Sequence, residues 1–113
     1  MAISLTNGSA TIGVTEFFLA SNSTTKVDQT DDAILQVWID FGAMAAGDVY
    51  EYRALEKVNA GTQRNALGPL RLVGVQSQPV IIAGLIVGDA WEIGVKRISG
   101  TDRSIGWSIR KVT

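Results

Sequence analysis

The chain of 113 residues contains no cysteine and no histidine. It therefore has no disulfide and no thiol nucleophile, and it lacks the imidazole used in acid–base catalysis and metal ligation. Charged residues are also few, at 19% of the chain, whereas 46% of the residues are hydrophobic. A domain of this size buries roughly two-thirds of its unfolded surface. The composition therefore predicts surplus apolar surface, available for self-association or for docking onto a larger body.

Export and membrane signals are also missing. Residues 1–8 do not show the basic segment followed by an apolar run that is typical of a signal peptide. The most hydrophobic stretch, residues 80–87, is too short to span a bilayer and predicts a buried strand. We therefore expect synthesis in the cytoplasm without export or membrane insertion.

The net charge of −1 hides an uneven distribution of charge along the chain. Residues 1–52 contain seven acids and one base, and residues 53–113 contain nine bases and four acids. Two differently charged faces of one domain would explain this distribution. A head-to-tail contact between the acidic patch of one copy and the basic patch of another would also explain it. The bases are spread along predicted strands and do not cluster with aromatic residues, which argues against nucleic-acid binding.

Apolar and polar residues alternate along most of the chain, a pattern typical of half-buried strands. The clearest case is residues 33–41, with Ala33, Leu35, Val37, Ile39 and Phe41 on one face and Ile34, Gln36, Trp38 and Asp40 on the other. Further strands are predicted over residues 11–19, 49–58, 91–96 and 104–110, and a polar loop over residues 21–32. A short helix at residues 42–46 is a rival to a turn, although five residues sustain little more than one turn.

The last two-thirds of the chain contain one pattern written twice. The motif Gly-Asp, followed two residues later by an aromatic residue and Glu, occurs at residues 47–51 and again at residues 88–92. Gly-Thr-x-Arg follows each copy, at residues 61–64 and 100–103. Such repetition predicts one supersecondary unit that occurs twice. We place the units at about residues 34–73 and 80–112, each with three antiparallel strands.

Two such units and one or two strands within an N-terminal arm or strand, residues 1–20, give seven or eight strands. At this spacing the choice lies between a sandwich and a closed barrel. We expect an all-β, antiparallel sandwich of jelly-roll or Greek-key type, with the whole chain, residues 1–113, as a single domain. Pro69 within the third strand of the first unit predicts an edge strand or a bulge.

Acidic motifs have a structural and a chemical interpretation. Gly-Asp before a strand is typical of turn chemistry, in which the aspartate caps the turn. Asp28, Asp31 and Asp32 would offer oxygen ligands to calcium, but their spacing matches no established calcium loop. Two carboxylates in one cleft would indicate glycoside hydrolysis, and candidate acids occur at Asp40, Glu51 and Glu92. Nothing in the sequence brings these three together, so no catalytic residue, metal site or cofactor is predicted.

Aromatic and basic residues supply the interface candidates. Three tryptophans and two tyrosines (Trp38, Trp91, Trp107, Tyr50 and Tyr52) fall at alternating strand positions, where sandwich core is the expected fate of most of them. Trp38 shares its face with polar residues and is the best candidate for an exposed aromatic residue. The two arginines of the Gly-Thr-x-Arg turns are expected to pair with Glu51 and Glu92 or to contact a neighbour. The interface candidates are Phe17, Phe18, Trp38, Arg64 and Arg103.

Three segments, residues 9–19, 37–40 and 100–110, resemble small proteins encoded among the structural genes of tailed bacteriophages, and the resemblance extends over nearly the whole chain. It implies a non-enzymatic virion protein on the capsid surface. Such a protein would be a small β-sandwich that decorates or cements the shell as a symmetric oligomer, with the major capsid protein or other virion proteins as partners. A neck, tail or baseplate component, a carbohydrate-binding module and a lyase or hydrolase domain are the alternatives. Residues 1–8 form either an arm that adds a strand to a neighbour or a locally paired first strand.

Overall fold

The computed structural model of the chain describes residues 2–59 and 61–112, which form eight β-strands and no helix. Residues 42–46, the rival helix, form turns instead, with Met44 N donating to Phe41 O at 3.0 Å. The strands are β1 (Ile3–Ile12), β2 (Phe17–Phe18), β3 (Ala33–Asp40), β4 (Val49–Glu56), β5 (Arg64–Val73), β6 (Val80–Val87), β7 (Glu92–Ser99) and β8 (Arg103–Val112).

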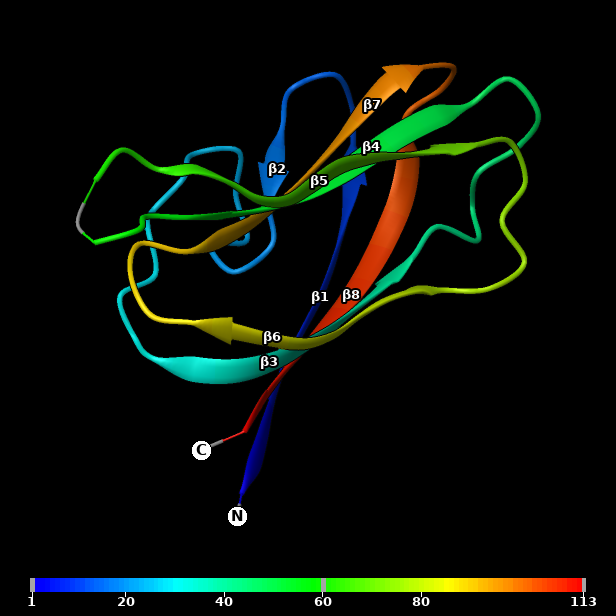
Figure 1. Cartoon of the computed structure of the whole chain (residues 1–113). Helices are drawn as coiled ribbons and strands as arrows, with labels where there is room; N and C mark the ends of the chain where they lie inside the picture. Colours follow the sequence, from blue (N-terminus) through cyan, green and yellow to red (C-terminus); the bar gives the residue numbers. More distant parts are fainter. Residues whose placement is uncertain (1, 60, 113) are drawn as a thin grey trace.

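The strands form two antiparallel four-stranded sheets packed as a sandwich. Sheet A has the order β1-β8-β3-β6, and sheet B has the order β2-β7-β4-β5. Figure 1 shows them as two layers, with β4, β5 and β7 in the upper layer and β3 and β6 in the lower one. Every connection crosses from one sheet to the other except the hairpin between β4 and β5. This order is that of a jelly roll, so the predicted fold class is confirmed.

The two repeat units contain three strands each, but neither unit is a three-stranded sheet. In the unit at residues 34–73, β3 lies in sheet A while β4 and β5 lie in sheet B. In the unit at residues 80–112, β6 and β8 lie in sheet A, where both pair with β3, and β7 pairs with β4 in sheet B. The interpretation of each unit as a local antiparallel sheet is wrong. The Gly-Thr-x-Arg turn closes a hairpin in the first unit but crosses the sandwich in the second, so the two units interleave.

The core lies between the sheets and is supplied by the alternating residues of each strand. The predicted inward face of residues 33–41 is confirmed, since Leu35, Val37, Ile39 and Phe41 are fully buried. The facing strands contribute the other large buried side chains: Ile12, Leu19, Tyr50, Trp91, Ile93, Val95, Ile105, Trp107 and Ile109. The expectation that most aromatic residues belong to the core is therefore correct for Tyr50, Trp91 and Trp107.

The N-terminal region departs from the sequence-based prediction. A single strand was expected over residues 11–19, but β1 ends at Ile12 and β2 begins at Phe17, because the chain passes there from sheet A to sheet B. Residues 3–8 pair with residues 112–107 of β8. They therefore form a locally paired first strand and not an arm that adds a strand to a neighbour. Met1 lies outside the described residues.

Two predictions concerned strands that lie at sheet edges: the one for the strand with Pro69 is confirmed, and the one for residues 80–87 is wrong. Pro69 lies in β5, at the edge of sheet B, and the register of β5 with β4 is irregular around Ala54. Both agree with the prediction of an edge or a bulge. Residues 80–87 were expected to be a buried strand, but β6 is the edge strand of sheet A, and Ile81 and Ile86 are exposed. The strand is apolar throughout, although only one of its faces packs on the core.

Candidate interaction surface

The outer face of sheet B carries ion pairs. Glu51 on β4 lies between Arg71 on β5 and Lys96 on β7, with N–O distances of 3.3 and 3.4 Å. Nearby, Arg53 forms a two-bond contact with Glu16, from Nε to Oε2 at 2.7 Å and from Nη2 to Oε1 at 2.6 Å. The charges on this face therefore have partners within the chain, and the face is suited to contact with water.

The outer face of sheet A is different, because an uninterrupted row of aliphatic residues crosses all four strands. Ile3 on β1 pairs with Val112 on β8, Val112 pairs with Ile34 on β3, and Ile34 pairs with Ile86 on β6. We call these four residues the aliphatic row. Ile3, Ile34 and Ile86 are 60%, 47% and 74% exposed. Leu5 on β1 and Ile81 on β6 extend the apolar surface, at 58% and 45% exposed.

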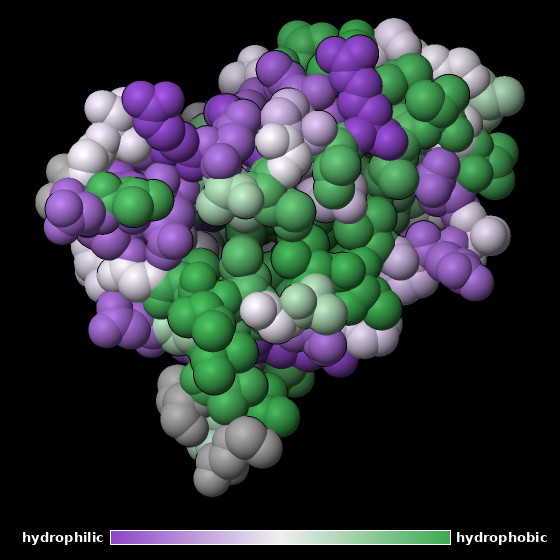
Figure 2. Space-filling view, in the orientation of Figure 1, coloured by the Kyte–Doolittle hydropathy of each residue, from purple (hydrophilic) through white to green (hydrophobic). Residues whose placement is uncertain are grey.

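This apolar surface is hollowed and continues around one side of the sandwich. A depression of about 330 Å³ lies beside the aliphatic row, lined by Ile3, Ile34, Leu35, Gln36, Gly84, Arg110 and Val112. Figure 2 shows hydrophobic residues gathered along the side where β5 and β6 lie and down toward the two chain ends. Contiguous exposed apolar surface of this kind marks an interaction site in soluble proteins.

A second depression, of about 430 Å³, lies beside Trp38 on the same face of sheet A. Its lining consists of Trp38, Asp40, Gly42, Gln76, Ser77, Gln78, Pro79, Gly106, Trp107 and Ser108. Trp38 is half-buried, and its Nε1 donates to Gln36 Oε1 at 2.8 Å. The guanidinium of Arg110 lies over the indole, 4.3 Å from its centroid. The depression thus combines one aromatic edge with a carboxylate, amides and hydroxyls.

The other predicted interface residues have different environments. Phe17 is half-buried and packs on Trp107 with ring centroids 5.4 Å apart, and Phe18 is buried. Arg64 is exposed at the start of β5. Arg103 forms an ion pair with Asp48. These four residues therefore do not form one surface with Trp38.

The two arginines were expected to pair with Glu51 and Glu92 or to contact a neighbour, and the pairing with a glutamate is wrong for Arg103. Arg103 Nε donates to Asp48 Oδ2 at 2.7 Å because β8 begins beside the turn that precedes β4. The same carboxylate accepts hydrogen bonds from Ala45 N and Thr101 N. These backbone donors, together with Arg103, lower the pKa of Asp48 to about 2. The aspartate therefore holds two turns together, in agreement with the interpretation of Gly-Asp as turn chemistry.

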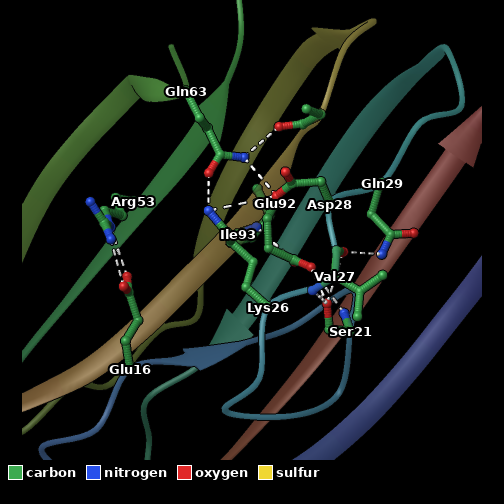
Figure 3. A network of polar contacts seen from close by, with 11 residues as sticks. Glu16, Ser21, Lys26, Val27, Asp28, Gln29, Arg53, Gln63, Glu92 and Ile93 are labelled. Carbon is green, nitrogen blue, oxygen red and sulfur yellow. Dashed lines mark hydrogen bonds and ion pairs between the residues drawn. The ribbon is translucent and has the colours of Figure 1, made fainter.

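Glu92 is fully buried, and its hydrogen-bond partners among the described residues are backbone N–H groups and one hydroxyl, with no base among them. Its Oε1 accepts from Ala20 N at 2.8 Å and Ile93 N at 2.9 Å, and its Oε2 accepts from Ser21 N at 3.1 Å and Ser21 Oγ at 2.6 Å. Figure 3 shows this carboxylate beside the loop that carries Ser21 and Val27. Burial raises the pKa of Glu92, although the four hydrogen bonds favour the ionised form. The residue anchors the loop after β2 to the start of β7.

Two of the three loop aspartates are engaged by protein groups. Asp28 accepts from Gln63 Nε2 at 3.0 Å, and Asp31 forms an ion pair with Lys111. Within residues 2–59 and 61–112, no group of three potential ligand side chains is placed to hold a metal ion. Asp40 lies in sheet A, whereas Glu51 and Glu92 lie in sheet B, and each carboxylate has separate partners.

Several acids from the first half of the chain lie beside bases from the second half in the folded chain. Five ion pairs connect an acid within residues 1–52 to a base within residues 53–113: Glu16–Arg53, Asp31–Lys111, Asp48–Arg103, Glu51–Arg71 and Glu51–Lys96. The jelly-roll order places strands of the acidic half beside strands of the basic half. Ion pairs within the chain thus use part of the charge of both halves.

The fold defines the chain as a jelly-roll β-sandwich. Comparison with protein-family models, with curated proteins and with solved structures gave no match. No helix within the described residues has the length and apolar character needed to cross a membrane.

Sequence reasoning identified Trp38 but not the aliphatic row. The row is formed by one residue from each of four strands, and the two ends of the chain, Ile3 and Val112, are neighbours in it. No local pattern signals this arrangement. The surplus of apolar residues over charged residues indicates that such a surface exists, but not where it lies.

Proposed function

We propose that this chain is a non-catalytic structural protein of a tailed-phage virion. It would be a decoration or cement protein that binds the assembled capsid shell as an oligomer. The observation that carries the proposal is the aliphatic row, which crosses all four strands of sheet A, while the outer face of sheet B carries ion pairs. A protein with an exposed apolar row on one sheet and paired charges on the other is suited to lie on a larger assembly with the charged sheet toward water.

The sequence resemblance to phage structural proteins supports the virion assignment, and jelly rolls recur in viral capsid proteins. The likeness of fold is an analogy and does not by itself define a function. The mechanism would be ordinary linkage: a protein that binds only the assembled lattice stabilises that lattice. Individual contacts need not be strong, because an oligomer that engages several shell subunits gains avidity.

Quantitative mass spectrometry of purified particles tests the proposal. A copy number comparable to that of the major shell protein supports decoration of the capsid surface. A small number that matches a ring would place the chain in a neck, tail or baseplate instead. Absence from the particle would overturn a virion role.

Co-sedimentation with assembled shells tests the docking face. Ile34→Asp places a charge in the centre of the aliphatic row and should abolish binding. Val58→Asp introduces the same charge at an exposed apolar residue between β4 and β5, and it should bind as the natural chain does. Equal binding by both variants would show that the aliphatic row is not the docking surface.

A second candidate function, carbohydrate binding, is favoured by the depression beside Trp38. Its indole, carboxylate, amides and hydroxyls are the groups with which proteins contact sugar rings, and jelly rolls also occur among lectins. Glycan-array binding that is lost in Trp38→Ala but kept in Ile34→Asp would support this function. Absence of glycan binding would leave the depression without this role.

A further inference from the structure

The sandwich has four sheet edges, and they differ in how they are protected from pairing with another strand. In sheet B, β2 has only two residues, and β5 carries Pro69 and two arginines. Short strands, proline and charge are the devices that prevent edge-to-edge association. In sheet A, β6 is eight residues long, contains no charged residue and no proline, and pairs with β3 alone among the described strands.

The sequence of β6 is nearly the same in both directions. Read outward from its centre, Ala83 matches Gly84, Ile82 matches Leu85, Ile81 matches Ile86 and Val80 matches Val87. Antiparallel pairing of two copies around a two-fold axis between residues 83 and 84 would place each of these residues opposite its match. A two-fold interface of this kind is self-complementary by construction.

Directly opposed residues must also point to the same face of a sheet. The matched residues of β6 meet this condition because β6 contains a β-bulge. In a regular strand, residues five apart point to opposite faces. In β6, two residues, 83 and 84, occupy the space opposite Gln36, because Leu35 pairs with Leu85 and Val37 pairs with Ile82. Gly84, one of the two bulge residues, has a φ of +72°, a backbone conformation that favours glycine.

The extra residue brings the matched positions onto common faces. Ile81 and Ile86 pair with Trp38 and Ile34, so both lie on the outer face, where both are exposed. Ile82 and Leu85 pair with Val37 and Leu35, whose side chains point into the core. Ile34 and Trp38 are four residues apart on β3, so their backbone N–H and C=O groups point to the same neighbouring strand. The same therefore holds for their partners on β6, Ile86 and Ile81.

The other uncharged edge lacks this match. β1 also reads similarly in both directions, from Ile3 to Ile12. Its register with β8 is unbroken, so Ile3 points outward and Ile12 points into the core. If two copies of β1 paired so that Ile3 lay opposite Ile12, the directly opposed residues would point to opposite faces of the sheet. Of the two edge strands of sheet A, only the bulged strand β6 is self-complementary both in sequence and in the faces to which its matched residues point.

We propose that the chain forms a two-fold homodimer through antiparallel pairing of β6 with β6 of a second copy. Sheet A then continues into an eight-stranded sheet, in which Ile81 of one copy lies opposite Ile86 of the other on the outer face. The aliphatic rows of the two copies come to lie on one surface. The apolar side of the sandwich near β5 and β6 (Figure 2) turns toward the partner. This deepens the proposed function, since it names the contact that makes the oligomer, but it is tested without particles.

Sedimentation equilibrium of the full chain gives the first test. The natural chain should be a dimer, and Ile86→Lys should be a monomer at the same concentration, because the lysine ends up against the apolar partner strand. Leu5→Lys adds the same charge at a similarly exposed position on β1, the other edge strand of sheet A, and should remain dimeric. A monomeric natural chain, or a dimer that survives Ile86→Lys, would overturn the proposal, as would dissociation by Leu5→Lys alone.

Disulfide trapping tests the register itself, since the natural chain has no cysteine. The double variant Ile81→Cys/Ile86→Cys should give a covalent dimer under mild oxidation, because directly opposed residues lie within disulfide reach. Each single variant should remain unlinked, because a residue and its own copy are separated along the strands. Failure of the double variant to link would overturn this register. Neither experiment involves a capsid shell. If the chain forms this dimer but is absent from purified particles, the proposed function is wrong and the dimer inference still holds.

Discussion

Arg103 donates from Nε to Oδ2 of Asp48 at 2.7 Å and thereby joins the start of β8 to the turn before β4. The carboxylate is 2% exposed and also accepts Thr101 N at 3.0 Å and Ala45 N at 2.8 Å. One buried aspartate thus organises the turns at one end of the sandwich, where strands of both sheets begin.

The low pKa of Asp48 predicts how stability depends on acid. Its pKa is about 2 in the folded chain against 3.8 for the ordinary carboxyl group. A group with a depressed folded pKa stabilises the fold above its unfolded pKa, and this contribution is lost as the pH falls toward the folded value. The stability difference between the natural chain and Asp48→Asn should therefore shrink from pH 4 to pH 2. Urea unfolding at several pH values measures it, and a constant difference would contradict the assignment.

Glu92→Ala should strongly destabilise the protein. The substitution removes the acceptor of Ala20 N, Ser21 N and Ile93 N in a buried site. Since an unsatisfied buried donor costs roughly 1–3 kcal/mol, we expect a loss of at least about 3 kcal/mol in the free energy of unfolding. Glu51→Ala is the control. Its ion pairs with Arg71 and Lys96 lie on the outer face of sheet B and should contribute less than about 1 kcal/mol.

Glu92 also predicts a pH dependence opposite in sign to that of Asp48. Burial raises its pKa above 4.5 in the folded chain. Its favourable contribution is complete below the unfolded pKa and declines as the pH rises through the folded pKa. The stability difference between the natural chain and Glu92→Ala should be larger at pH 4 than at pH 7. A difference that grows with pH would show that the buried carboxylate has a depressed pKa.

Tyr50→Phe should lower stability by about 1–3 kcal/mol. The Tyr50 hydroxyl accepts from Arg103 N at 2.7 Å and donates to Ile12 O at 2.8 Å, and it lies within the core. Removal leaves both backbone groups without this partner. Tyr52 is half-buried, and its hydroxyl makes no hydrogen bond with any described residue. Tyr52→Phe should therefore leave the melting temperature nearly unchanged, and equal effects of the two variants would contradict this account.

Gly8→Ala should destabilise the pairing of β1 with β8. A Cβ at Gly8 would overlap the indole of Trp107, its partner across the strands. Overpacking of this kind typically costs about 1–3 kcal/mol. Gly106 is adjacent to Trp107 on β8, and a Cβ there meets nothing closer than 3.8 Å, so Gly106→Ala serves as the matched control. Thermal unfolding should separate the two variants.

Much of the fold follows from local pattern. Alternation in residues 33–41 predicts an inward row, because side chains on a strand point to opposite faces in turn, and the buried residues Leu35, Val37 and Ile39 agree with it. Pro69 predicts an edge because it has no N–H for a second neighbour. The absence of cysteine and histidine and the apolar composition likewise follow from the sequence alone.

Only the tertiary structure decides which strands are neighbours. The repeat units predict three strands each, but local sequence does not state that β3 pairs with β6 and β8 while β4 pairs with β7. The burial of β6 was mispredicted for the same reason: an apolar run looks alike at an edge and in a centre. The aliphatic row and the buried environment of Glu92 join residues far apart in the chain. Such contacts depend on the packing of the whole sandwich, which periodicity along one strand does not encode.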